Sequence, residues 1–531
     1  MFFKRLGVML DCSRNAVMTV AELKRYISVL HKMGYNELQL YTEETYEIEG
    51  EPFFGLHRGR YTAEELQEVD AFCASLGMEL VPNIQTLAHL NAAVRWPDYR
   101  PLVDFGDILL VDDERTYVLI EKMFQALRRS FTSNRVHIGM DEAHMLGRGQ
   151  FMDRYGVQER SEILLRHLDR VCAIADKYGF EPMMWSDMFY RLANGGEYYA
   201  YNTNFSDEIK AKIPEKLTLV YWDYYSTDRK RYDGMLRGHL ALCPRVAFAG
   251  GAWKWSGFAP HNSFSIACTR AALKSCIRNG VQEVLMTCWG DDGAEASAWS
   301  ILPTLAYAAC LAQGITKMAD IKAKFAEWVG YAYDDFMLLE LPDKFGPGNN
   351  NNPAKYALYN DCFMGILDKH IDETDGKTYA SYARRLNNAA KRTGEFSHLF
   401  DTAAKLCSLL SLKVDLGIRT KVAYFSGEPE ALDAIIRDYG KVIKRTEIFY
   451  EAFRRQWYAE NKPHGFDVQD IRIGGLIQRL RSCRDRLMQY RNGEITDIPE
   501  LHDDTPPFAQ EGHIVYNCWL HTVSANVLFP V

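Results

Sequence analysis

The sequence lacks the patterns that would place it in several common classes of protein. Its 531 residues contain no apolar run of about 18 residues, the minimum for a membrane-spanning helix. Lysine and arginine (62) are fewer than aspartate and glutamate (70), for a net charge of −8. Because there is no basic surplus to neutralise phosphates, we expect no nucleic-acid partner and no membrane partner.

Cysteine motifs are also missing. The 12 cysteines form no Cys-x-x-Cys pair, which argues against a zinc ribbon or a dithiol redox site. In a chain with this large a potential core we expect buried free thiols in a reducing cytoplasm. The apolar run at the start is interrupted by Lys4 and Arg5 and ended by Asp11, unlike a secretory signal. We therefore expect a cytoplasmic protein.

Nucleotide-binding and common hydrolase motifs do not occur either. There is no G-x-G-x-x-G turn and no P-loop, which an open doubly wound sheet would usually carry. H-E-x-x-H and G-x-S-x-G are absent as well. We expect no cofactor and no metal.

What is present is a repeating alternation of short apolar runs and longer helical segments. The helical segments include 63–76, where Thr62 and Glu65 form a capping-box pattern, and 161–178, which ends at Gly179. Eight such units predict an α/β fold, a closed (β/α)8 TIM barrel. The eight strands are expected at residues 6–13, 37–42, 79–85, 135–141, 181–187, 217–223, 246–253 and 284–290.

The character of the sequence changes after residue 315. Helical patterns dominate there, at residues 355–370, 377–423, 429–459 and 468–491. We expect three regions: a catalytic barrel (1–315), a connecting helix with a Pro/Gly/Asn-rich linker (316–354), and an α-helical C-terminal domain (355–531). The helical domain could form a homodimer interface or only brace the barrel, and the sequence does not choose between them.

Catalytic residues of a TIM barrel lie at the C-terminal ends of its strands. Charged residues and five of the ten tryptophans fall at those ends, which packing alone would not produce in every unit. The residues there are Arg14, Glu43, Glu44, His89, Asp141, Glu142, Trp185, Asp187, Trp222, Asp223, Tyr224, Tyr225, Trp253, Trp255, Trp289, Asp291 and Asp292.

The fourth strand carries the central motif, residues 135–144. Strand alternation predicts that His137, Gly139 and Asp141 face the barrel lumen, with Gly139 leaving room near the axis. Glu142 would project over the mouth. Two adjacent carboxyls repel each other, which raises the affinity of one of them for a proton and suits general-acid cleavage of a glycosidic bond. Adjacency argues against a pair that straddles the anomeric carbon.

Two other interpretations remain beside a glycosidase. A metal-dependent TIM-barrel hydrolase could use His137, Asp141 and His144, although His144 lies beyond the turn and strand alternation does not favour it. A catalytically silent sugar-binding barrel would use tryptophan platforms but would not need the acidic pair. His137 and His89 could equally be hydrogen-bonded residues of the lumen.

The run from His137 to Glu142 resembles the H-x-G-x-D-E signature of family-20 glycoside hydrolases, the β-N-acetylhexosaminidases. The resemblance spans residues 6–310 and is strongest to a bacterial intracellular-type subgroup with a helical C-terminal domain. It implies an exo-acting, retaining enzyme that removes terminal β-linked GlcNAc or GalNAc from an oligosaccharide or glycoconjugate. In that family the substrate's own acetamido oxygen attacks the anomeric carbon through an oxazolinium intermediate.

Carried over by position, the resemblance implies a role for each matching residue. Glu142 is similar to the general acid/base, and Asp141 to the residue that orients the acetamido N–H. Arg14 and Asp291 resemble residues that grip the sugar hydroxyls, and His89 takes the place of a histidine after strand three. The aromatic walls of the sugar pocket correspond to Trp185, Trp222 and Trp289.

The sequence departs from the family at two places. A family tyrosine near strand seven binds the acetamido oxygen, but strand seven here offers Trp253 and no tyrosine. Tyr224 or Tyr225 from strand six would have to replace it. Strand two offers Glu43 where an aspartate is commoner. We include Glu43, His137, Tyr224, Tyr225 and Trp253 among the expected substrate-binding residues.

Overall fold

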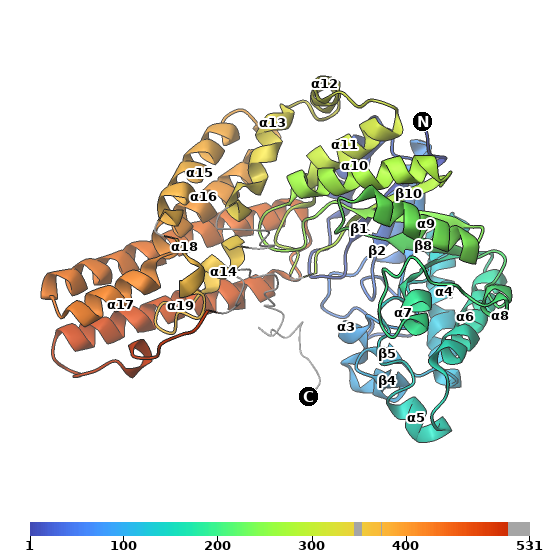
Figure 1. The fold of residues 1–531 in the computed structure, drawn as a ribbon, viewed down its shortest axis with the longest axis horizontal. Coiled ribbons are helices and arrows are strands. Elements are labelled where there is room, and N and C mark those ends of the chain that lie inside the picture. Colours follow the sequence, from blue (N-terminus) through green and yellow to red (C-terminus); the bar gives the residue numbers. More distant parts are fainter. Residues whose placement is uncertain (292, 345–352, 373, 508–531) are drawn as a thin grey trace.

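The computed structural model describes residues 1–291, 293–344, 353–372 and 374–507. Its N-terminal part is a closed barrel of parallel strands in the order β1-β10-β9-β8-β7-β6-β3-β2 (Figure 1). The predicted (β/α)8 barrel is therefore confirmed, and each predicted run overlaps one strand. The strands are β1 (Arg5–Asp11), β2 (Glu37–Tyr41), β3 (Glu79–Asn83), β6 (Arg135–His137), β7 (Glu181–Trp185), β8 (Thr218–Trp222), β9 (Val246–Gly251) and β10 (Glu283–Cys288).

Helices surround this barrel, each following a strand and packing its apolar side inward. The predicted capping box at Thr62 is present: its side chain accepts from the backbone N–H of Glu65, whose carboxylate accepts from Thr62 N–H. The main helices are α1 (Val20–Met33), α2 (Ala63–Ser75), α4 (Glu114–Ser130), α6 (Arg160–Lys177), α9 (Arg229–Leu242), α10 (Asn262–Arg278) and α11 (Leu302–Ala312).

The long segments that follow several strands carry short elements of their own. The segment after β3 contains a small antiparallel pair, and shorter helices follow β6 and β7. These elements lie at the lower right in Figure 1. They are α3 (Asn91–Val94), β4 (Val103–Phe105), β5 (Ile108–Leu109), α5 (Gln150–Tyr155), α7 (Asp187–Ala193) and α8 (Asp207–Ala211).

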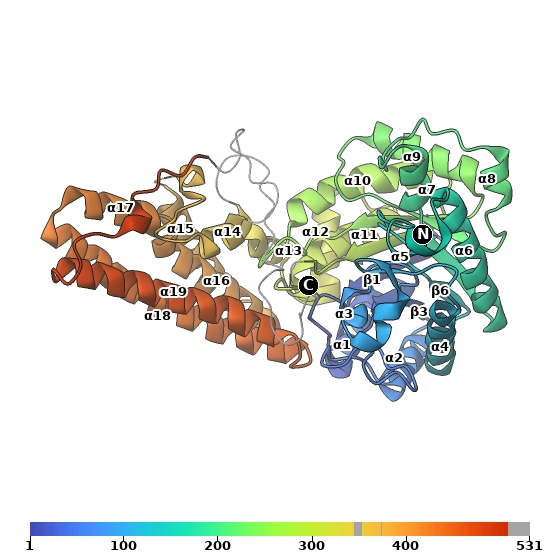
Figure 2. The same ribbon diagram turned by 90° about the horizontal axis from the view of Figure 1, so that it is seen from below.

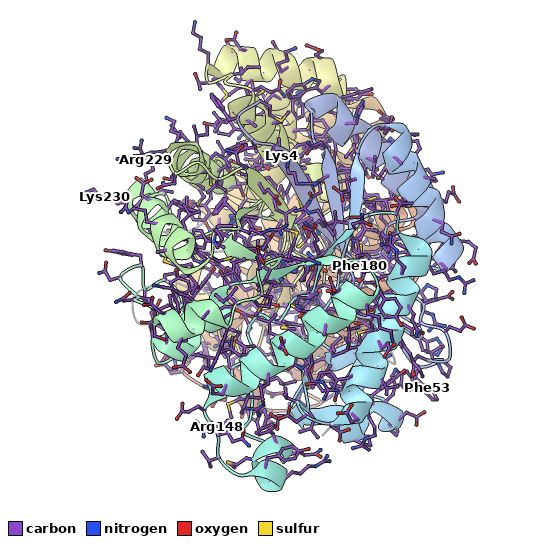
Figure 3. All side chains as sticks on the ribbon, turned by 90° about the vertical axis from the view of Figure 1, so that its right-hand side faces the viewer. Lys4, Phe53, Arg148, Phe180, Arg229 and Lys230 are labelled. Carbon is purple, nitrogen blue, oxygen red and sulfur yellow. The ribbon has the colours of Figure 1, made fainter. Side chains whose placement is uncertain are left out.

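The N-terminal end of the barrel is closed by charged side chains. Arg135 forms ion pairs with Glu37 and Glu283, and Arg5 forms one with Glu79. In Figure 3, Lys4 and Phe180, the residues that precede β1 and β7, lie toward the middle of the view and helices lie around them. Paired charges line this end, and because the catalytic sites of TIM barrels lie at the opposite end, we expect the substrate pocket there.

Strand β6 is shorter than the sequence predicts. It ends at His137, and Gly139, Met140 and Glu142 then adopt left-handed backbone conformations with φ of 71°, 71° and 51°. We had expected strand alternation to extend to Asp141, and this expectation is wrong. The direction of the Asp141 side chain is set instead by an irregular turn, which non-glycine residues adopt only when surrounding contacts hold them there.

Residues 318–343 connect the barrel to the helical region. They form α12 (Met318–Val329), α13 (Tyr333–Phe336) and a 3₁₀ segment, Met337–Asp343. The Gly- and Asn-rich part of the expected linker lies outside the described residues. The boundaries we expect between the three regions stay a prediction.

The C-terminal region is helical, as expected, and extends away from the barrel (Figures 1 and 2). The expected helix 377–423 is three helices, because Gly394 turns the chain in a left-handed conformation and a second break follows Lys413. Little of the expected helix 355–370 forms beyond Tyr359. The helices are α14 (Pro353–Tyr359), α15 (Asp375–Ala390), α16 (Ser397–Lys413), α17 (Leu416–Ser426), α18 (Pro429–Glu460) and α19 (Phe466–Arg491).

The described residues bear on the expected free thiols and on the expected lack of a membrane-spanning helix. Ten of the eleven described cysteines are buried, Cys172 is partly buried, and all eleven are unpaired thiols. None of the described helices has the length and apolarity needed to cross a membrane.

Candidate active site

A pocket with a cavity volume of about 100 Å³ opens at the C-terminal end of the barrel. Most of the residues expected at the site line it, although they come from strand ends spread over the whole barrel. The lining residues are Arg14, Tyr41, His89, Asp141, Glu142, Trp185, Trp222, Tyr224, Tyr225, Trp255, Trp289 and Asp291.

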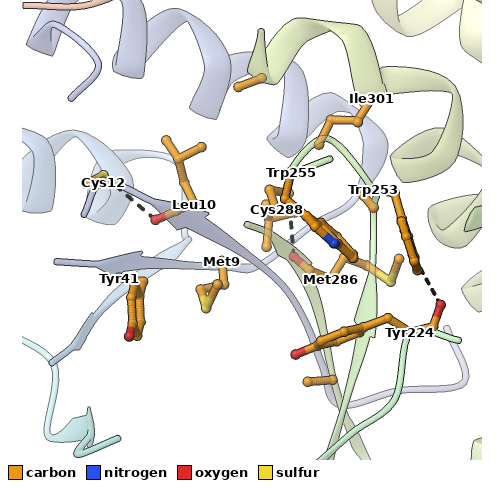
Figure 4. Packing of buried hydrophobic residues seen from close by; sticks show 14 of the residues in the cluster. Met9, Leu10, Cys12, Tyr41, Tyr224, Trp253, Trp255, Met286, Cys288 and Ile301 are labelled. Atoms are coloured by element: carbon orange, nitrogen blue, oxygen red, sulfur yellow. Dashed lines mark hydrogen bonds between the residues drawn. The ribbon is translucent and has the colours of Figure 1, made fainter. Parts of the chain in front are cut away.

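Three expected substrate-binding residues lie behind the pocket wall instead. Glu43 is buried and lies 3.2 Å from the Arg14 guanidinium. His137 is fully buried against Trp185, with ring centroids 4.2 Å apart. Trp253 stacks on Trp255 at 4.5 Å and donates its indole N–H to the Tyr224 carbonyl oxygen (Figure 4). Each of the three is covered by a residue that lines the pocket, so none of them lines it, and their contact with substrate stays a prediction.

Asp141 lies at the base of the pocket, held by two side chains from the turn after β3. Gln85 donates a hydrogen bond of 2.6 Å to its Oδ1, and His89 Nε2 lies 3.3 Å from its Oδ2. A Cβ atom added to Gly139 would lie 2.1 Å from Gln85 Oε1. The glycine predicted to leave room near the axis therefore makes room for the side chain that orients Asp141.

The charges of Asp141 and His89 stabilise each other. Burial opposes ionisation of Asp141, but His89 and the Gln85 hydrogen bond outweigh it and keep the pKa of Asp141 below its usual value. Burial also opposes a charged His89, yet Asp141 and then Glu43 raise the pKa of His89 to about 10. Near neutral pH the base of the pocket therefore holds a carboxylate beside an imidazolium.

Glu142 is the more exposed of the two neighbouring acids, with 40% of its side chain accessible. Its backbone N–H donates to Asp187 Oδ2 at 3.1 Å, which anchors its left-handed turn. One carboxylate oxygen lies 3.6 Å from the Arg191 guanidinium and the other 3.7 Å from His89 Nε2. Glu142 can therefore reach into the mouth of the pocket while its backbone is fixed.

Asp187, buried behind Glu142, is a carboxyl with a raised pKa. Burial, followed by the charges of Asp141 and Glu142, raises the pKa of Asp187 to about 7. Asp187 is not one of the described residues that line the pocket. Repulsion within a group of carboxyls was expected from the sequence, but the group extends to Asp187, which an adjacent strand supplies.

The opposite side of the pocket joins the first and last strands of the barrel. Arg14 follows β1, and Trp289 and Asp291 follow β10; the two strands pair directly. Asp11 accepts a hydrogen bond of 2.8 Å from the backbone N–H of Gly290, which ties the two loops together. Burial raises the pKa of Asp291 to about 6, although the Arg14 charge opposes the shift.

Aromatic rings form the remaining walls. Trp185 lies 5.9 Å from Trp289 between ring centroids, and Tyr224 stacks on Trp222 at 5.4 Å. Tyr41, which meets Trp289 edge-on at 4.7 Å, and Trp255 also line the pocket, and we did not include them among the expected site residues. Trp255 follows Trp253 by two residues, so the strand-end rule already pointed to it; Tyr41, the last residue of β2, gave no such signal.

The metal interpretation involves His137, Asp141 and His144. His137 is covered by Trp185, whereas His144 is exposed beyond the Glu142 turn. Among the described residues, no group of three or more His, Cys, Asp or Glu side chains is arranged to hold a metal ion.

Two family models match this chain. The model "Glycosyl hydrolase family 20, catalytic domain" matches residues 3–231, and "Glycoside Hydrolase 20C C-terminal domain" matches residues 334–517. The first match contains Arg14, His89, Asp141 and Glu142, and the second contains all of α15–α19.

Individual relatives are distant. The chain is 24% identical to Hexosaminidase D of Homo sapiens over 273 residues, which cover 50% of this chain and 52% of the relative. It is 28% identical to a Beta-hexosaminidase of Vibrio furnissii over 177 residues, 26% of this chain and 29% of the relative. The chain thus spans about half or less of the length of these relatives. A crystal structure of a GH20 exo β-N-acetylglucosaminidase from Vibrio harveyi is 15% identical, with a TM-score of 0.47 and coverage of 64% of this chain and 58% of that one.

Proposed function

The chain belongs to glycoside hydrolase family 20, and on that premise we propose that it is an exo-acting, retaining β-N-acetylhexosaminidase. Its substrate would be a terminal, non-reducing β-linked GlcNAc or GalNAc of an oligosaccharide or glycoconjugate. The observation that carries this proposal is the pair Asp141 and Glu142, held side by side in an aromatic pocket by separate contacts.

Substrate-assisted catalysis follows from which carboxyls reach the pocket. Among the described residues only Asp141, Glu142 and Asp291 line it. Asp187 lies behind Glu142, and Asp223 is occupied by Tyr221 and Arg231. Asp141 and Glu142 are neighbours, and Asp291, on the opposite side of the pocket, is assigned with Arg14 to the sugar hydroxyls. No carboxylate of this set is then left to act as the nucleophile. The acetamido oxygen of the substrate would then be the nucleophile.

In this mechanism the two acids have different tasks. Glu142, partly exposed at the mouth, would protonate the leaving oxygen and afterwards activate water. Asp141, kept ionised by His89, would accept the acetamido N–H and offset the positive charge that develops on the oxazolinium ring. A carboxylate fixed in advance needs no reorganisation when that charge forms.

Tyr224 is the better candidate to bind the acetamido oxygen. Its side chain is 5% exposed, whereas Tyr225 is 48% exposed. Tyr224 lines the pocket, and burial raises the pKa of its phenol, which therefore stays neutral near physiological pH. A neutral phenol there can donate to a carbonyl oxygen.

Arg14 and Asp291 would grip the sugar hydroxyls on the far side of the pocket. A guanidinium and a carboxylate fixed beside each other can bind neighbouring hydroxyls as donor and acceptor. Such a closed end favours removal of one terminal sugar at a time. Digestion of a chito-oligosaccharide followed by mass spectrometry should show only loss of single terminal residues, and an internal cut would contradict the exo assignment.

The activity itself is tested with p-nitrophenyl glycosides. We expect release of p-nitrophenol from the β-N-acetylglucosaminide, near inertness of the plain β-glucoside, and strong inhibition by a thiazoline that mimics the cyclised intermediate. Activity should survive EDTA treatment. A covalent glycosyl-enzyme trapped with a 2-fluoro sugar during productive turnover would contradict the substrate-assisted mechanism, and zinc-dependent recovery after EDTA would favour the metal interpretation.

A cytoplasmic location is part of the proposal and is supported by the unpaired, mostly buried thiols of the described cysteines. Cell fractionation with an activity assay tests it. For the helical region, sedimentation equilibrium distinguishes a homodimer from a monomer.

A further inference from the structure

We propose that the C-terminal helical region positions the side of the pocket that carries Arg14 and Asp291, called here the sugar-gripping side, and that Arg472 is the main positioning residue. It acts through a buried ion cluster with Glu295 and Lys355. The inference rests on the proposed function, because it assigns a task in sugar binding to a region far from the catalytic acids.

The cluster joins the barrel to two helices of the C-terminal region. Glu295 follows β10, Lys355 lies on α14 and Arg472 on α19. The Glu295 carboxylate lies 2.8 Å from Lys355 Nζ and 2.9 Å from an Arg472 guanidinium nitrogen. All three side chains are at most 3% exposed. Two cations on one carboxylate, away from water, hold it strongly, and they keep the pKa of Glu295 low despite its burial.

Glu295 is close in the chain to two residues that line the pocket. Trp289 and Asp291 precede it, and the backbone N–H groups of Gly293 and Ala294 both donate to the Gly290 carbonyl oxygen. This tight turn places Ala294 in a left-handed conformation with φ of 55°. Because such a turn is strained for alanine, contacts on both sides have to hold it. On one side Gly290 is bonded to Asp11, and on the other Glu295 is held by the helical region.

Helix α19 approaches this turn closely, at a position whose backbone conformation favours glycine. A Cβ atom added to Gly293, whose φ is 127°, would lie 2.7 Å from an Arg472 guanidinium nitrogen. Arg472 therefore packs directly against the backbone that follows Asp291. A displacement of the Arg472 side chain would be transmitted to that turn.

The helical region also contacts the loop that carries Arg14. The backbone N–H of Thr19 donates to the Glu460 carbonyl oxygen, and that of Lys462 donates to the Val17 carbonyl oxygen. A Cβ atom added to Gly465 would lie 2.4 Å from the Asn15 carbonyl oxygen. The turn between α18 and α19, the end of this helix pair nearest the barrel in Figure 2, thus packs against the residues that follow Arg14.

The catalytic acids are held differently. Asp141 is bound by Gln85 and His89, and Glu142 by Asp187, all within the barrel. A disturbance at the Arg472 cluster should therefore reach the sugar-gripping loops and leave the acids in place. This difference allows the proposal to be tested by separating KM from kcat.

The experiment compares Arg472→Met with Arg479→Met in the full-length protein. Both residues lie on α19, and each forms an ion pair with a carboxylate. Arg472 pairs with Glu295 of the barrel, whereas Arg479 pairs with Asp361 inside the helical region. Methionine keeps an apolar stem of similar length and removes the charge. Arg472→Lys serves as the conservative variant. KM, kcat and the pH profile of kcat are measured with p-nitrophenyl β-N-acetylglucosaminide and the corresponding galactosaminide.

A displacement on the order of 1 Å at a binding group can reduce the rate up to about 100-fold. We therefore expect Arg472→Met to raise KM at least about tenfold. We also expect it to change the ratio of kcat/KM between the glucosaminide and the galactosaminide. We expect kcat to change less than about threefold, with an unaltered pH profile. Arg472→Lys should recover part of the loss, and Arg479→Met should match the wild type. If Arg472→Met does not fold, Glu295→Gln, which keeps its shape and can still accept hydrogen bonds, gives the same readouts.

Three results overturn the inference. Unchanged KM and sugar ratio in a folded Arg472→Met show that the cluster does not position the loops, while the proposed function stands. An equal loss in Arg479→Met shows a general effect of weakening the helical region. A wild-type protein inactive on every N-acetylhexosaminide overturns the proposed function, and the inference with it.

Discussion

The two sides of the pocket differ in what holds them in place. The proposed catalytic side, with Asp141 and Glu142, is built from consecutive barrel units between residues 85 and 191, and the side chains that hold the two acids come from within them. Gln85 also donates a hydrogen bond to Tyr41 of β2. The sugar-gripping side, with Arg14 and Asp291, comes from the two ends of the barrel sequence and is also held by the helical region. In our proposal the chemistry would therefore depend mainly on neighbouring barrel units, while substrate fit would depend on contacts between distant parts of the chain.

The electrostatics differ in the same way. On the catalytic side an imidazolium keeps Asp141 ionised. On the sugar-gripping side burial dominates: it raises the pKa of Glu43 to about 7 and that of Asp291 to about 6, despite the Arg14 charge nearby. The first side holds Asp141 ionised, as its proposed role requires, and the second has carboxyls whose pKa values lie close to physiological pH.

The largest effect is expected from Glu142→Gln, on the catalytic side. Proton donation to the leaving oxygen contributes on the order of 10²–10⁴-fold to the rate, so kcat on a chito-oligosaccharide should fall by about that factor. Substrates with good leaving groups, such as p-nitrophenyl glycosides, should lose less, and KM should change little. Steady-state kinetics on both substrate types measures this, and equal losses on the two would show that Glu142 is not the acid.

A somewhat smaller loss is expected from Asp141→Asn. Removing one preorganised electrostatic contact to a developing charge costs about 10²–10³-fold in kcat. Because Asp141 would act on the acetamido group and not on the leaving oxygen, the loss should be similar for good and poor leaving groups. Inhibition by the thiazoline should weaken in parallel. Thiazoline binding unchanged from the wild type would contradict the role of Asp141.

On the sugar-gripping side, Asp291→Asn should change the pH dependence and not the catalytic step. With a pKa of about 6, Asp291 loses its charge as the pH falls through that value. Since a charged hydrogen bond is worth about 1.5–3 kcal/mol, kcat/KM of the wild type should fall about tenfold or more on this acid limb. The variant should show a raised KM and no limb near pH 6. A limb that persists in Asp291→Asn would assign the titration to another group.

The smallest effect concerns stability on the catalytic side. The pKa of His89 is raised to about 10 in the folded protein, whereas the pKa of histidine in an unfolded chain is about 6.5. Pairing with Asp141 therefore stabilises the fold fully below about pH 6.5. This stabilisation is lost as the pH rises through about 10. We expect His89→Asn to lower the free energy of unfolding by about 1–2 kcal/mol at pH 6. Asparagine suits the left-handed backbone at this position, where φ is 59°.

Denaturant unfolding of wild type and His89→Asn at several pH values measures this difference. The gap between the two curves should narrow between pH 7 and pH 10. A gap that is constant with pH would show that His89 stabilises the fold without its charge, and the permanent charge on the catalytic side would lose its main support.

Much of the fold was predictable because it depends on local patterns. Period-two and helical spacing located every barrel strand, and the Thr62–Glu65 capping box identified the start of α2. The rule that TIM-barrel sites lie at strand ends then selected most of the pocket residues. The end of β6 was predicted wrongly, because it depends on contacts with residues far away in the chain. The strand ends at His137, and the turn that follows depends on Gln85 packing against Gly139.

The sequence by itself determined the barrel, the family and the acidic pair, because spacing and a short motif report the backbone and the chemistry of residues close in the chain. Only the tertiary structure decided that Glu43, His137 and Trp253 stand behind the pocket wall. It also decided that Glu295 meets Arg472 across the two regions. Barrel closure and helix packing create such contacts between residues far apart in the chain, and no periodicity in the sequence records which of those residues will meet.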